Sequence, residues 1–212
     1  MAQSNSKQID TWTGDFGVAY LERNRLNADL LRKRTMFFGK IAKILEGRAP
    51  GKILEVGSNV GINLAAIRQV FDAELTAVEP FDAAREELTK SGILPPGRIH
   101  KAVGKDLPFA DGSFDLAFTS GVLIHVNPDD VAKTIDEVVR VSRRFVLCIE
   151  YFAPKQEEII YHGQGGLLFR NDFGGIYMDR HPELELMEYG FLWRRVSSFD
   201  DCVWWLFEKK QG

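Results

Sequence analysis

The sequence contains little cysteine. Cys148 and Cys202 are the only two among 212 residues, and both lie in apolar runs. Domains that depend on disulfides carry many more cysteines, whereas isolated cysteines in apolar runs are typically buried. We therefore expect two buried free thiols and a reducing, cytoplasmic environment.

Long hydrophobic runs and an excess of one charge sign are also absent. No apolar stretch reaches the roughly 20 residues that a membrane-spanning helix needs, and the N-terminal MAQSNSKQID is polar. The 27 basic and 30 acidic residues give a formal net charge of -3. This balance gives no electrostatic reason to expect nucleic acid or a membrane as partner, so we expect a soluble protein.

What is present is the composition of a folded domain, with 45% hydrophobic and 27% charged residues. Residues 1–11 are expected to form a disordered tail, and residues 12–212 show no repeat or linker that would divide them. Strand-like apolar runs alternate with helical periodicity, which predicts a mostly parallel sheet with helices on both faces. The expected strands are 52–57, 74–79, 98–103, 114–119 and 144–150, and the expected helices are 25–46, 60–70, 81–90 and 129–141.

The C-terminal part has a different pattern. Residues 184–196 and 201–208 are strand-like runs separated by a Ser-Ser-Phe-Asp turn, which predicts an antiparallel hairpin. The expected fold is therefore α/β, a Rossmann-like, mostly parallel seven-stranded sheet with a C-terminal antiparallel hairpin. An exposed sheet edge beside this hairpin is compatible with a homodimer.

The sequence ILEVGSNVGINL, residues 53–64, predicts a strand that enters a tight turn and then a helix. Dinucleotide-binding turns have the pattern G-x-G-x-x-G, which lets the backbone approach a pyrophosphate. Counted from Gly57, the second and third glycine positions hold Asn59 and Ile62, and no G-x-x-x-x-G-K-[ST] pattern occurs in the chain. The turn therefore disfavours a phosphate ligand and a nicotinamide-dependent enzyme.

S-adenosylmethionine carries no phosphate and makes other demands on such a turn. Its site needs close backbone approach, a carboxylate for the ribose hydroxyls and polar groups for the amino-acid end. Glu55, Gly57 and Gly61 flank the turn, Asn59 tolerates unusual backbone angles, and Glu79 ends the next expected strand. Glycines at such turns also occur for steric reasons alone, so the order of strand, turn, helix, strand and acid is what indicates this cofactor.

Longer stretches add a family resemblance. Residues 106–126, DLPFADGSFDLAFTSGVLIHV, resemble the segment that contains the fourth strand of class I S-adenosylmethionine-dependent methyltransferases. The resemblance is closer to the subgroup of pseudaminic-acid biosynthesis-associated methylases, in GDFGVAYLERN, EVGSNVGINL, SGVLIHVNPDD, VLCIEYFAP and LFRNDFGG. It covers residues 12–209, and in that subgroup the middle position of the turn is also asparagine.

The resemblance implies S-adenosylmethionine as cofactor and assigns parts of the chain to parts of that molecule. The segment before L-P-F borders the adenine, and the end of the fourth strand borders the methionine part. The N-terminal GDFGVAYLERN segment reaches the amino-acid end, where an arginine suits a carboxylate. Besides the turn and Glu79, the expected cofactor contacts are Tyr20, Arg23, Asn24, Asn63, Pro80, Lys105, Asp106, Leu107, Thr119 and Ser120.

Candidate catalytic residues follow from the chemistry of methyl transfer. The reaction is an in-line displacement, so positioning and exclusion of water supply most of the catalysis, and a base is needed only where the acceptor loses a proton. His125, Glu150 and Tyr151 follow expected strands at the sheet edge where such folds place their sites. His125 is the first candidate, with a histidine that packs near a helix start as an equal alternative. Glu150 ends an apolar strand, where an acid is costly unless it is paired or serves a site.

The stretch YHGQGGLLFRNDFGG contains the glycines expected of a mobile cover. His162, Arg170 and Asp172 in it are candidates for binding a polar acceptor, with an ordinary solvated surface loop as the alternative. Asp129 and Asp130 lie at an expected helix start, where the helix dipole explains them better than a metal ion does, so no metal site is expected.

Three functions remain open. The first is S-adenosylmethionine-dependent methyl transfer to an oxygen or nitrogen of a small polar metabolite, such as a sugar or a nonulosonate or sugar-nucleotide pathway intermediate. The second is a scaffold protein that keeps the fold and the cofactor without turnover. The third is an NAD-dependent oxidoreductase. The donor turn together with candidate proton acceptors favours the first.

Overall fold

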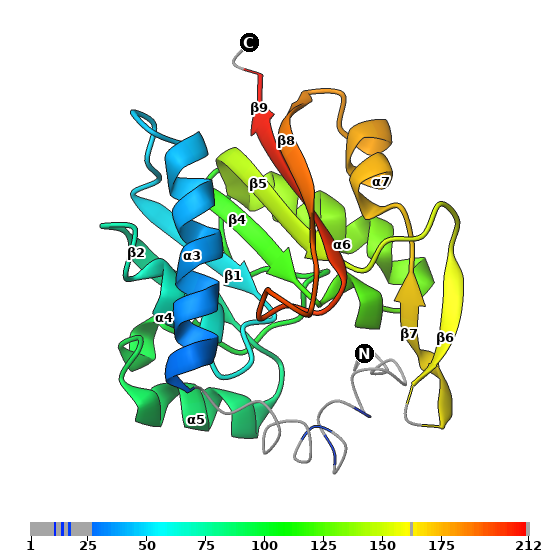
Figure 1. The fold of residues 1–212 in the computed structure, drawn as a ribbon, viewed down its shortest axis with the longest axis horizontal. Helices are drawn as coiled ribbons and strands as arrows, with labels where there is room; N and C mark the ends of the chain where they lie inside the picture. Colours follow the sequence, from blue (N-terminus) through cyan, green and yellow to red (C-terminus); the bar gives the residue numbers. More distant parts are fainter. Residues whose placement is uncertain (1–10, 12–13, 15–16, 18–26, 162, 211–212) are drawn as a thin grey trace.

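The computed structural model describes Thr11, Gly14, Gly17, residues 27–161 and residues 163–210. Helices and strands alternate along most of the chain (Figure 1). The elements are α3 (Ala28–Ile44), β1 (Lys52–Val56), α4 (Ile62–Ile67), β2 (Glu74–Val78), α5 (Asp82–Ser91), η1 (Pro96–Arg98), β3 (Ile99–His100), β4 (Phe114–Ser120), η2 (Leu123–His125), α6 (Pro128–Val141), β5 (Ser142–Glu150), β6 (Glu157–Tyr161), β7 (Gln164–Arg170), α7 (Phe173–Arg180), β8 (Leu184–Leu192) and β9 (Cys202–Lys209).

Seven strands form one sheet in the order β3-β2-β1-β4-β5-β9-β8. The first five strands of this order pair in parallel, and β9 pairs antiparallel with both β5 and β8. The predicted mostly parallel sheet with a C-terminal antiparallel hairpin is thus confirmed. Strand order reverses between β1 and β4, and ligands of open α/β sheets bind at the carboxyl ends of strands beside such a reversal.

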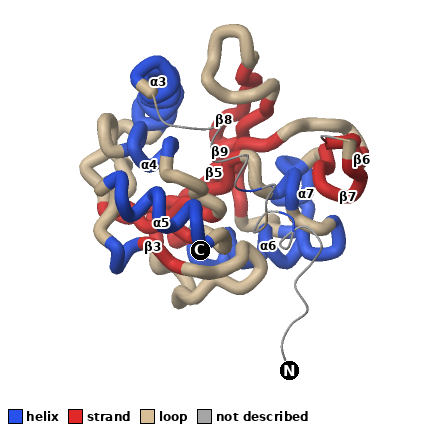
Figure 2. Tube along the Cα trace, turned by 90° about the horizontal axis from the view of Figure 1, so that it is seen from below, coloured by secondary structure: helices blue, strands red, loops and turns tan. Residues whose placement is uncertain are grey.

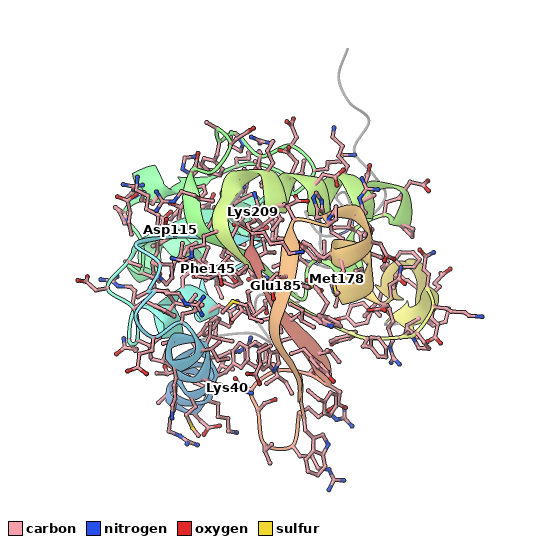
Figure 3. All side chains as sticks on the ribbon, turned by 90° about the horizontal axis from the view of Figure 1, so that it is seen from above. Lys40, Asp115, Phe145, Met178, Glu185 and Lys209 are labelled. Atoms are coloured by element: carbon pink, nitrogen blue, oxygen red, sulfur yellow. The ribbon has the colours of Figure 1, made fainter. Side chains whose placement is uncertain are left out.

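The two faces of the sheet carry separate cores. One cluster joins the sheet to α3, α4 and α5 through residues such as Phe38 and Leu64, and the other joins it to α6 and α7 through residues such as Val138 and Tyr177. Figure 2 shows these two groups of helices on opposite sides of the sheet. In Figure 3, α3, which carries Lys40, and α7, which carries Met178, lie on opposite sides of the strands at the centre of the view. The prediction of helices on both faces is confirmed.

Several predicted boundaries were wrong. The strand expected at 98–103 is reduced to two residues, because η1 takes residues 96–98 and the chain then turns at a bridge between Val103 and Asp106. The helix expected at 60–70 begins only after Gly61, whose φ of 79° lies in the left-handed region. β8 ends at Leu192 rather than at 196, because the backbone folds back and the amides of residues 196 and 197 donate to the carbonyl of Trp193.

The glycine-rich stretch expected as a loop holds regular structure instead. β6 and β7 pair antiparallel as a hairpin outside the main sheet, and α7 follows directly. Asp172 caps the N-terminus of α7, because its carboxylate accepts a hydrogen bond from the Gly175 amide at 2.9 Å. Gly174 lies against the ring of Trp205, where a Cβ would collide with the indole. Gly174, and Gly175 against the Asp172 carboxylate, therefore serve close packing, a role that composition alone does not separate from flexibility.

Both cysteines are buried and free, as predicted. Among the described residues, no helix combines the length and apolar character that crossing a membrane requires. In the same part of the chain, no group of three or more histidine, cysteine or acidic side chains is placed to hold a metal ion.

Candidate active site

A cavity of about 180 Å³ opens at the carboxyl ends of β1, β2 and β4, where the strand order reverses. Apolar side chains such as Val56, Val78 and Phe81 form much of its wall, and Glu79 and Lys105 supply charge. Such a mixture of apolar walls and a few polar groups is typical of a small-molecule site. The other lining residues are Gly17, Gly57, Asn59, Pro80, Ala102, Val103, Gly104, Gly121, Val122, His125, Val126, Asn127, Asp130 and Thr134.

The turn between β1 and α4 forms the floor of this cavity with an unusual backbone. Gly57 has a φ of 75°, and Asn59, with a φ of 48°, is the one non-glycine residue with positive φ among those described. A Cβ on Gly57 would lie 2.5 Å from Cγ2 of Val122 across the cavity wall. Gly61 does not line the cavity, because it lies against Leu88 of α5. Gly57 and Asn59 therefore shape the site, while Gly61 serves packing.

Glu79 connects this turn to the end of β2 through hydrogen bonds. Its Oε2 accepts a hydrogen bond from the Asn59 amide at 2.7 Å, and its Oε1 accepts one from the Phe81 amide at 2.9 Å. Burial raises the pKa of Glu79, and the two backbone hydrogen bonds oppose that rise. Each carboxylate oxygen can accept a second hydrogen bond, so Glu79 can hold the turn and still accept from a ligand hydroxyl.

A smaller cavity of about 70 Å³ lies on the other side of the same turn. Asn63 donates to Glu55 Oε1 at 2.7 Å, and Arg34 Nη1 donates to Asn63 Oδ1 at 2.9 Å. Glu55 Oε2 and the Ser58 hydroxyl are buried and have no hydrogen-bond partner among the residues that the structure describes. Gly57 and Asn59 line this cavity too, and Ile62 and Ser120 complete it.

The two oxygen atoms without a hydrogen-bond partner, Glu55 Oε2 and the Ser58 hydroxyl, indicate which ligand groups the smaller cavity can bind. A buried polar atom without a partner costs roughly 1–3 kcal/mol, so a ligand that donates hydrogen bonds here is stabilised. Burial raises the pKa of Glu55 to about 8, and a bound cation would favour the ionised form again. Arg34, at the same wall, suits a carboxylate. An ammonium near Glu55 and a carboxylate near Arg34 together match the α-amino-acid part of a ligand.

His125 lies at the wall of the larger cavity. Its Nδ1 is 2.7 Å from the carbonyl oxygen of Leu167 on β7, and its ring centroid is 5.6 Å from that of Tyr161 on β6. Because a carbonyl only accepts, Nδ1 carries the proton and Nε2 is the acceptor atom of the ring. Burial lowers the pKa of His125 to about 4, so the ring is neutral near pH 7.

Glu150 and Tyr151 line neither cavity. The Glu150 carboxylate is fully buried and accepts hydrogen bonds from the amides of Val122 at 3.1 Å and Ile124 at 3.4 Å. It therefore holds the backbone of the cavity wall from behind. The Tyr151 hydroxyl donates to Asp200 at 2.6 Å, in the connection between β8 and β9.

The remaining predicted site residues fall into three groups. Pro80 and Lys105 line the larger cavity, with Lys105 Nζ 2.8 Å from Asp130 Oδ2, and Ser120 and Asn63 line the smaller one. The following line neither cavity: exposed Asp106 and Arg170, buried Leu107 and Thr119, and Asp172, which caps α7. Tyr20, Arg23, Asn24 and His162 lie outside the described residues, as does most of the expected tail.

Sequence reasoning missed Arg34, Ser58, Gly104 and Val122. Arg34 comes from α3, and no local pattern connects it to a turn that begins more than twenty positions later. Gly104 is explained by contact, since a Cβ there would lie 2.8 Å from Cγ2 of Thr134 on α6. In the sequence, the signal that could have identified Gly104 as a site residue was its position just before the L-P-F segment.

The contribution of Glu150 to the stability of the fold has a testable pH dependence. Burial raises its pKa from the ordinary 4.5 to about 7. The folded state thus binds a proton more tightly than the unfolded state, which stabilises the fold below pH 4.5, and this contribution is lost as pH rises through 7. Glu150→Gln cannot titrate, so the stability of the wild type relative to this variant is expected to fall by roughly 1–3 kcal/mol between pH 4.5 and pH 8. Urea unfolding of both proteins across that range measures it, and a constant difference would contradict the assignment.

Comparison with known proteins agrees with this geometry. Residues 54–148, from β1 to β5, match the family described as Methyltransferase domain. The O-methyltransferase cnsE of Penicillium expansum is 31% identical over 102 residues, which span 45% of this chain and 36% of that protein. An uncharacterized methyltransferase of Mycobacterium sp. (strain JLS) is 30% identical over 157 residues, 72% of this chain and 59% of that protein. The chain thus spans between about one third and three fifths of these relatives.

A solved structure extends the likeness to the whole fold. The 1,6-didemethyltoxoflavin-N1-methyltransferase of Burkholderia thailandensis, with bound 1,6-didemethyltoxoflavin and S-adenosylhomocysteine, aligns with a TM-score of 0.74 at 14% identity. The alignment covers 100% of this chain and 92% of that one. The chain therefore has the Rossmann-like fold of class I methyltransferases, with its central part, residues 54–148, similar in sequence to the methyltransferase domain.

Proposed function

We propose that this protein is an S-adenosylmethionine-dependent methyltransferase that acts on an oxygen or nitrogen of a small polar molecule. The observation that supports this most is the pair of cavities that meet at Gly57 and Asn59. One holds a carboxylate, Glu79, suited to ribose hydroxyls, and the other holds Glu55 and Arg34, suited to an amino acid. A nucleoside joined to an amino acid has these two ends.

The residues present fit the parts of that cofactor. Glu79 would accept from the ribose hydroxyls, and Pro80, Phe81, Val103 and Lys105 would surround the adenine. The orphaned Glu55 Oε2 and Ser58 hydroxyl would gain partners from the amino-acid end. When bound, the cofactor supplies an activated methyl group on a sulfonium. The chain's own part is then to hold both reactants in line and to exclude water, for which the apolar walls are suited.

The same geometry disfavours the nicotinamide alternative. Two carboxylates, Glu55 and Glu79, border the turn, and the Asn59 amide donates to Glu79 instead of pointing at a phosphate. A pyrophosphate there would compete with Glu79 for the Asn59 amide, and the turn itself supplies no cation to bind it. Methyltransferases and nicotinamide-dependent enzymes are both expected to have an acid that accepts hydrogen bonds from the ribose hydroxyls. The two classes therefore differ at the position where a pyrophosphate would bind.

A cofactor-binding protein without turnover is the second candidate. It is favoured by the positions of Glu150 and Tyr151, which lie outside both cavities and leave His125 as the one predicted base at the wall. Incubation with S-adenosylmethionine and a sugar-nucleotide or cell extract separates the two. Accumulation of S-adenosylhomocysteine supports the enzyme, and bound but unconsumed cofactor supports the alternative.

The acceptor belongs to the same proposal. The named relatives methylate oxygen in one case and nitrogen in the other, so they leave the acceptor atom open. The resemblance of SGVLIHVNPDD and LFRNDFGG to pseudaminic-acid biosynthesis-associated methylases supports a sugar or nonulosonate pathway intermediate. Polar acceptors of this kind carry hydroxyl or amino groups that lose a proton on methylation, which gives His125 a role.

A substitution at His125 tests that role. Nε2 of the neutral ring is the proton-accepting atom, so His125→Ala is expected to lower kcat by roughly 10²- to 10⁴-fold for a hydroxyl acceptor, as loss of a general base does. Cofactor affinity should change little, because the Gly57 turn and Glu79 remain. Turnover of an accepted substrate at the wild-type rate would show that His125 is not the base.

A further inference from the structure

The connection between β8 and β9, residues 193–201, contacts a side chain of the candidate site from outside. It lies beside α3 in both Figure 1 and Figure 3. Arg34 of α3 donates from Nη2 to the carbonyl oxygen of Ser198 at 3.1 Å, and its Cζ lies 3.4 Å from the centroid of the Phe199 ring. Arg34 lines the smaller cavity, whereas residues 193–201 line neither cavity. The connection therefore acts on the site through Arg34.

Phe199 is held in place although it lies outside regular structure. Its side chain is buried, and its ring meets the Phe37 ring edge-on with centroids 5.0 Å apart. The Ser197 hydroxyl donates to the Phe199 carbonyl at 3.1 Å and accepts from the Phe199 amide at 3.3 Å. The next residue, Asp200, accepts the hydrogen bond from Tyr151 on β5's carboxyl side. The ring thus presents a fixed face to the guanidinium, which stacks favourably on aromatic faces.

The contacts of Arg34 extend this fixed arrangement to Glu55 in the smaller cavity. Arg34 Nη1 donates to Asn63, which in turn donates to Glu55. A guanidinium is planar, so contacts on its face and at both terminal nitrogens determine the directions of its N–H groups. A long side chain that is fixed before a ligand arrives loses little further freedom on binding, which favours affinity.

We propose that Phe199 is a positioning residue, which holds the Arg34 guanidinium in the orientation that binds the carboxylate at the amino-acid end of the cofactor. This inference rests on the proposed function, because that end belongs to S-adenosylmethionine. Phe199 would act on this end alone, since the nucleoside end lies in the other cavity with Glu79. Its loss should therefore weaken only those ligands that carry the amino-acid part.

Two ligands that differ in this part provide the test. S-adenosylhomocysteine has the amino-acid part, whereas 5′-methylthioadenosine keeps the nucleoside and the sulfur and lacks it. Phe199→Leu keeps an apolar side chain against Phe37 but removes the aromatic face from Arg34. By calorimetry, we expect it to weaken S-adenosylhomocysteine binding by roughly 5- to 30-fold and to change 5′-methylthioadenosine binding by less than about 2-fold. Phe199→Met, whose flexible side chain fills the space of the ring, should show the same selective loss.

The matched control is Phe145→Leu. Phe145 is also buried, belongs to the same core cluster, and has Cζ of Arg144 4.8 Å from its ring centroid. It lines neither cavity, so this variant should lower stability and leave the affinities for both ligands close to the wild type. A general loss of stability thereby separates from a loss of orientation at Arg34.

A double variant tests whether Phe199 acts through Arg34. Arg34→Lys keeps the charge but not the planar fork, so it should weaken S-adenosylhomocysteine selectively, and adding Phe199→Leu should cause little further loss. Equal weakening of both ligands by Phe199→Leu, an unchanged affinity for S-adenosylhomocysteine, or fully additive losses in the double variant would each overturn the inference. A wild type that binds neither ligand would instead refute the proposed function itself.

Discussion

Glu79→Gln is expected to weaken S-adenosylhomocysteine binding by roughly 10- to 100-fold. The carboxylate accepts from the amides of Asn59 and Phe81, and glutamine would turn an NH₂ group toward one of these donors. The variant would also lose a charge-assisted hydrogen bond to the ribose. A hydrogen bond to a charged group contributes roughly 1.5–3 kcal/mol, and 1.4 kcal/mol corresponds to a tenfold change in Kd. Isothermal titration calorimetry measures the change directly.

The matched control is Glu74→Gln, at the other end of the same strand. Glu74 is exposed, forms a surface ion pair with Arg98 at 2.5 Å and lines neither cavity. Surface pairs of this kind contribute little, so affinity and folding should both remain close to the wild type. If the Glu79→Gln and Glu74→Gln variants both bound S-adenosylhomocysteine as tightly as the wild type, Glu79 would have no role in holding the ribose.

Gly57→Ala is expected to have an effect of similar size for a different reason. The added methyl group would lie 2.5 Å from Cγ2 of Val122, so Val122 must shift toward the cavity or the turn must open. The φ of 75° adds strain of roughly 1–2 kcal/mol for a residue with a Cβ. We expect at least a tenfold loss of S-adenosylhomocysteine affinity and a lower melting temperature, measured by calorimetry and thermal unfolding.

Gly92→Ala separates strain from obstruction. Gly92 has a φ of 67° at the end of α5, and no described heavy atom lies within 4 Å of an added Cβ. This control should lower stability by a similar amount and leave cofactor binding intact. In the double variant Gly57→Ala with Val122→Ala, the removed methyl groups make room again, so part of the affinity should return. Equal loss of binding in Gly92→Ala would mean that stability, not cavity shape, governs affinity.

The sheet could be predicted from the sequence because its signals are local and agree with one another. β1, β2, β4 and β5 are nearly continuous apolar runs, as buried parallel strands must be, and α6 begins with an asparagine cap and a proline. The hairpin of β6 and β7 was missed because three glycines interrupt the side-chain alternation that marks a strand. In α7, a helix of eight residues, the second and third residues are glycines that pack against neighbouring groups.

The site residues also separate into those that local sequence signals identify and those that only the fold brings together. Gly57, Asn59, Glu55 and Glu79 could be found because the turn and the strand ends that carry them are contiguous in the sequence. The role of Glu150 could not, because the sequence does not say whether a buried acid faces a cavity or a backbone amide, and only the fold brings Val122 to it. Arg34 likewise reaches the smaller cavity only through the packing of α3 against α4.

The central claim is that the turn between β1 and α4 holds an adenosyl sulfonium across two cavities. Calorimetry of the wild-type chain with S-adenosylhomocysteine, and separately with NAD, tests it most directly. The account predicts saturable binding of S-adenosylhomocysteine with one site per chain and no measurable heat with NAD. Binding of NAD alone, or of neither ligand, would contradict it.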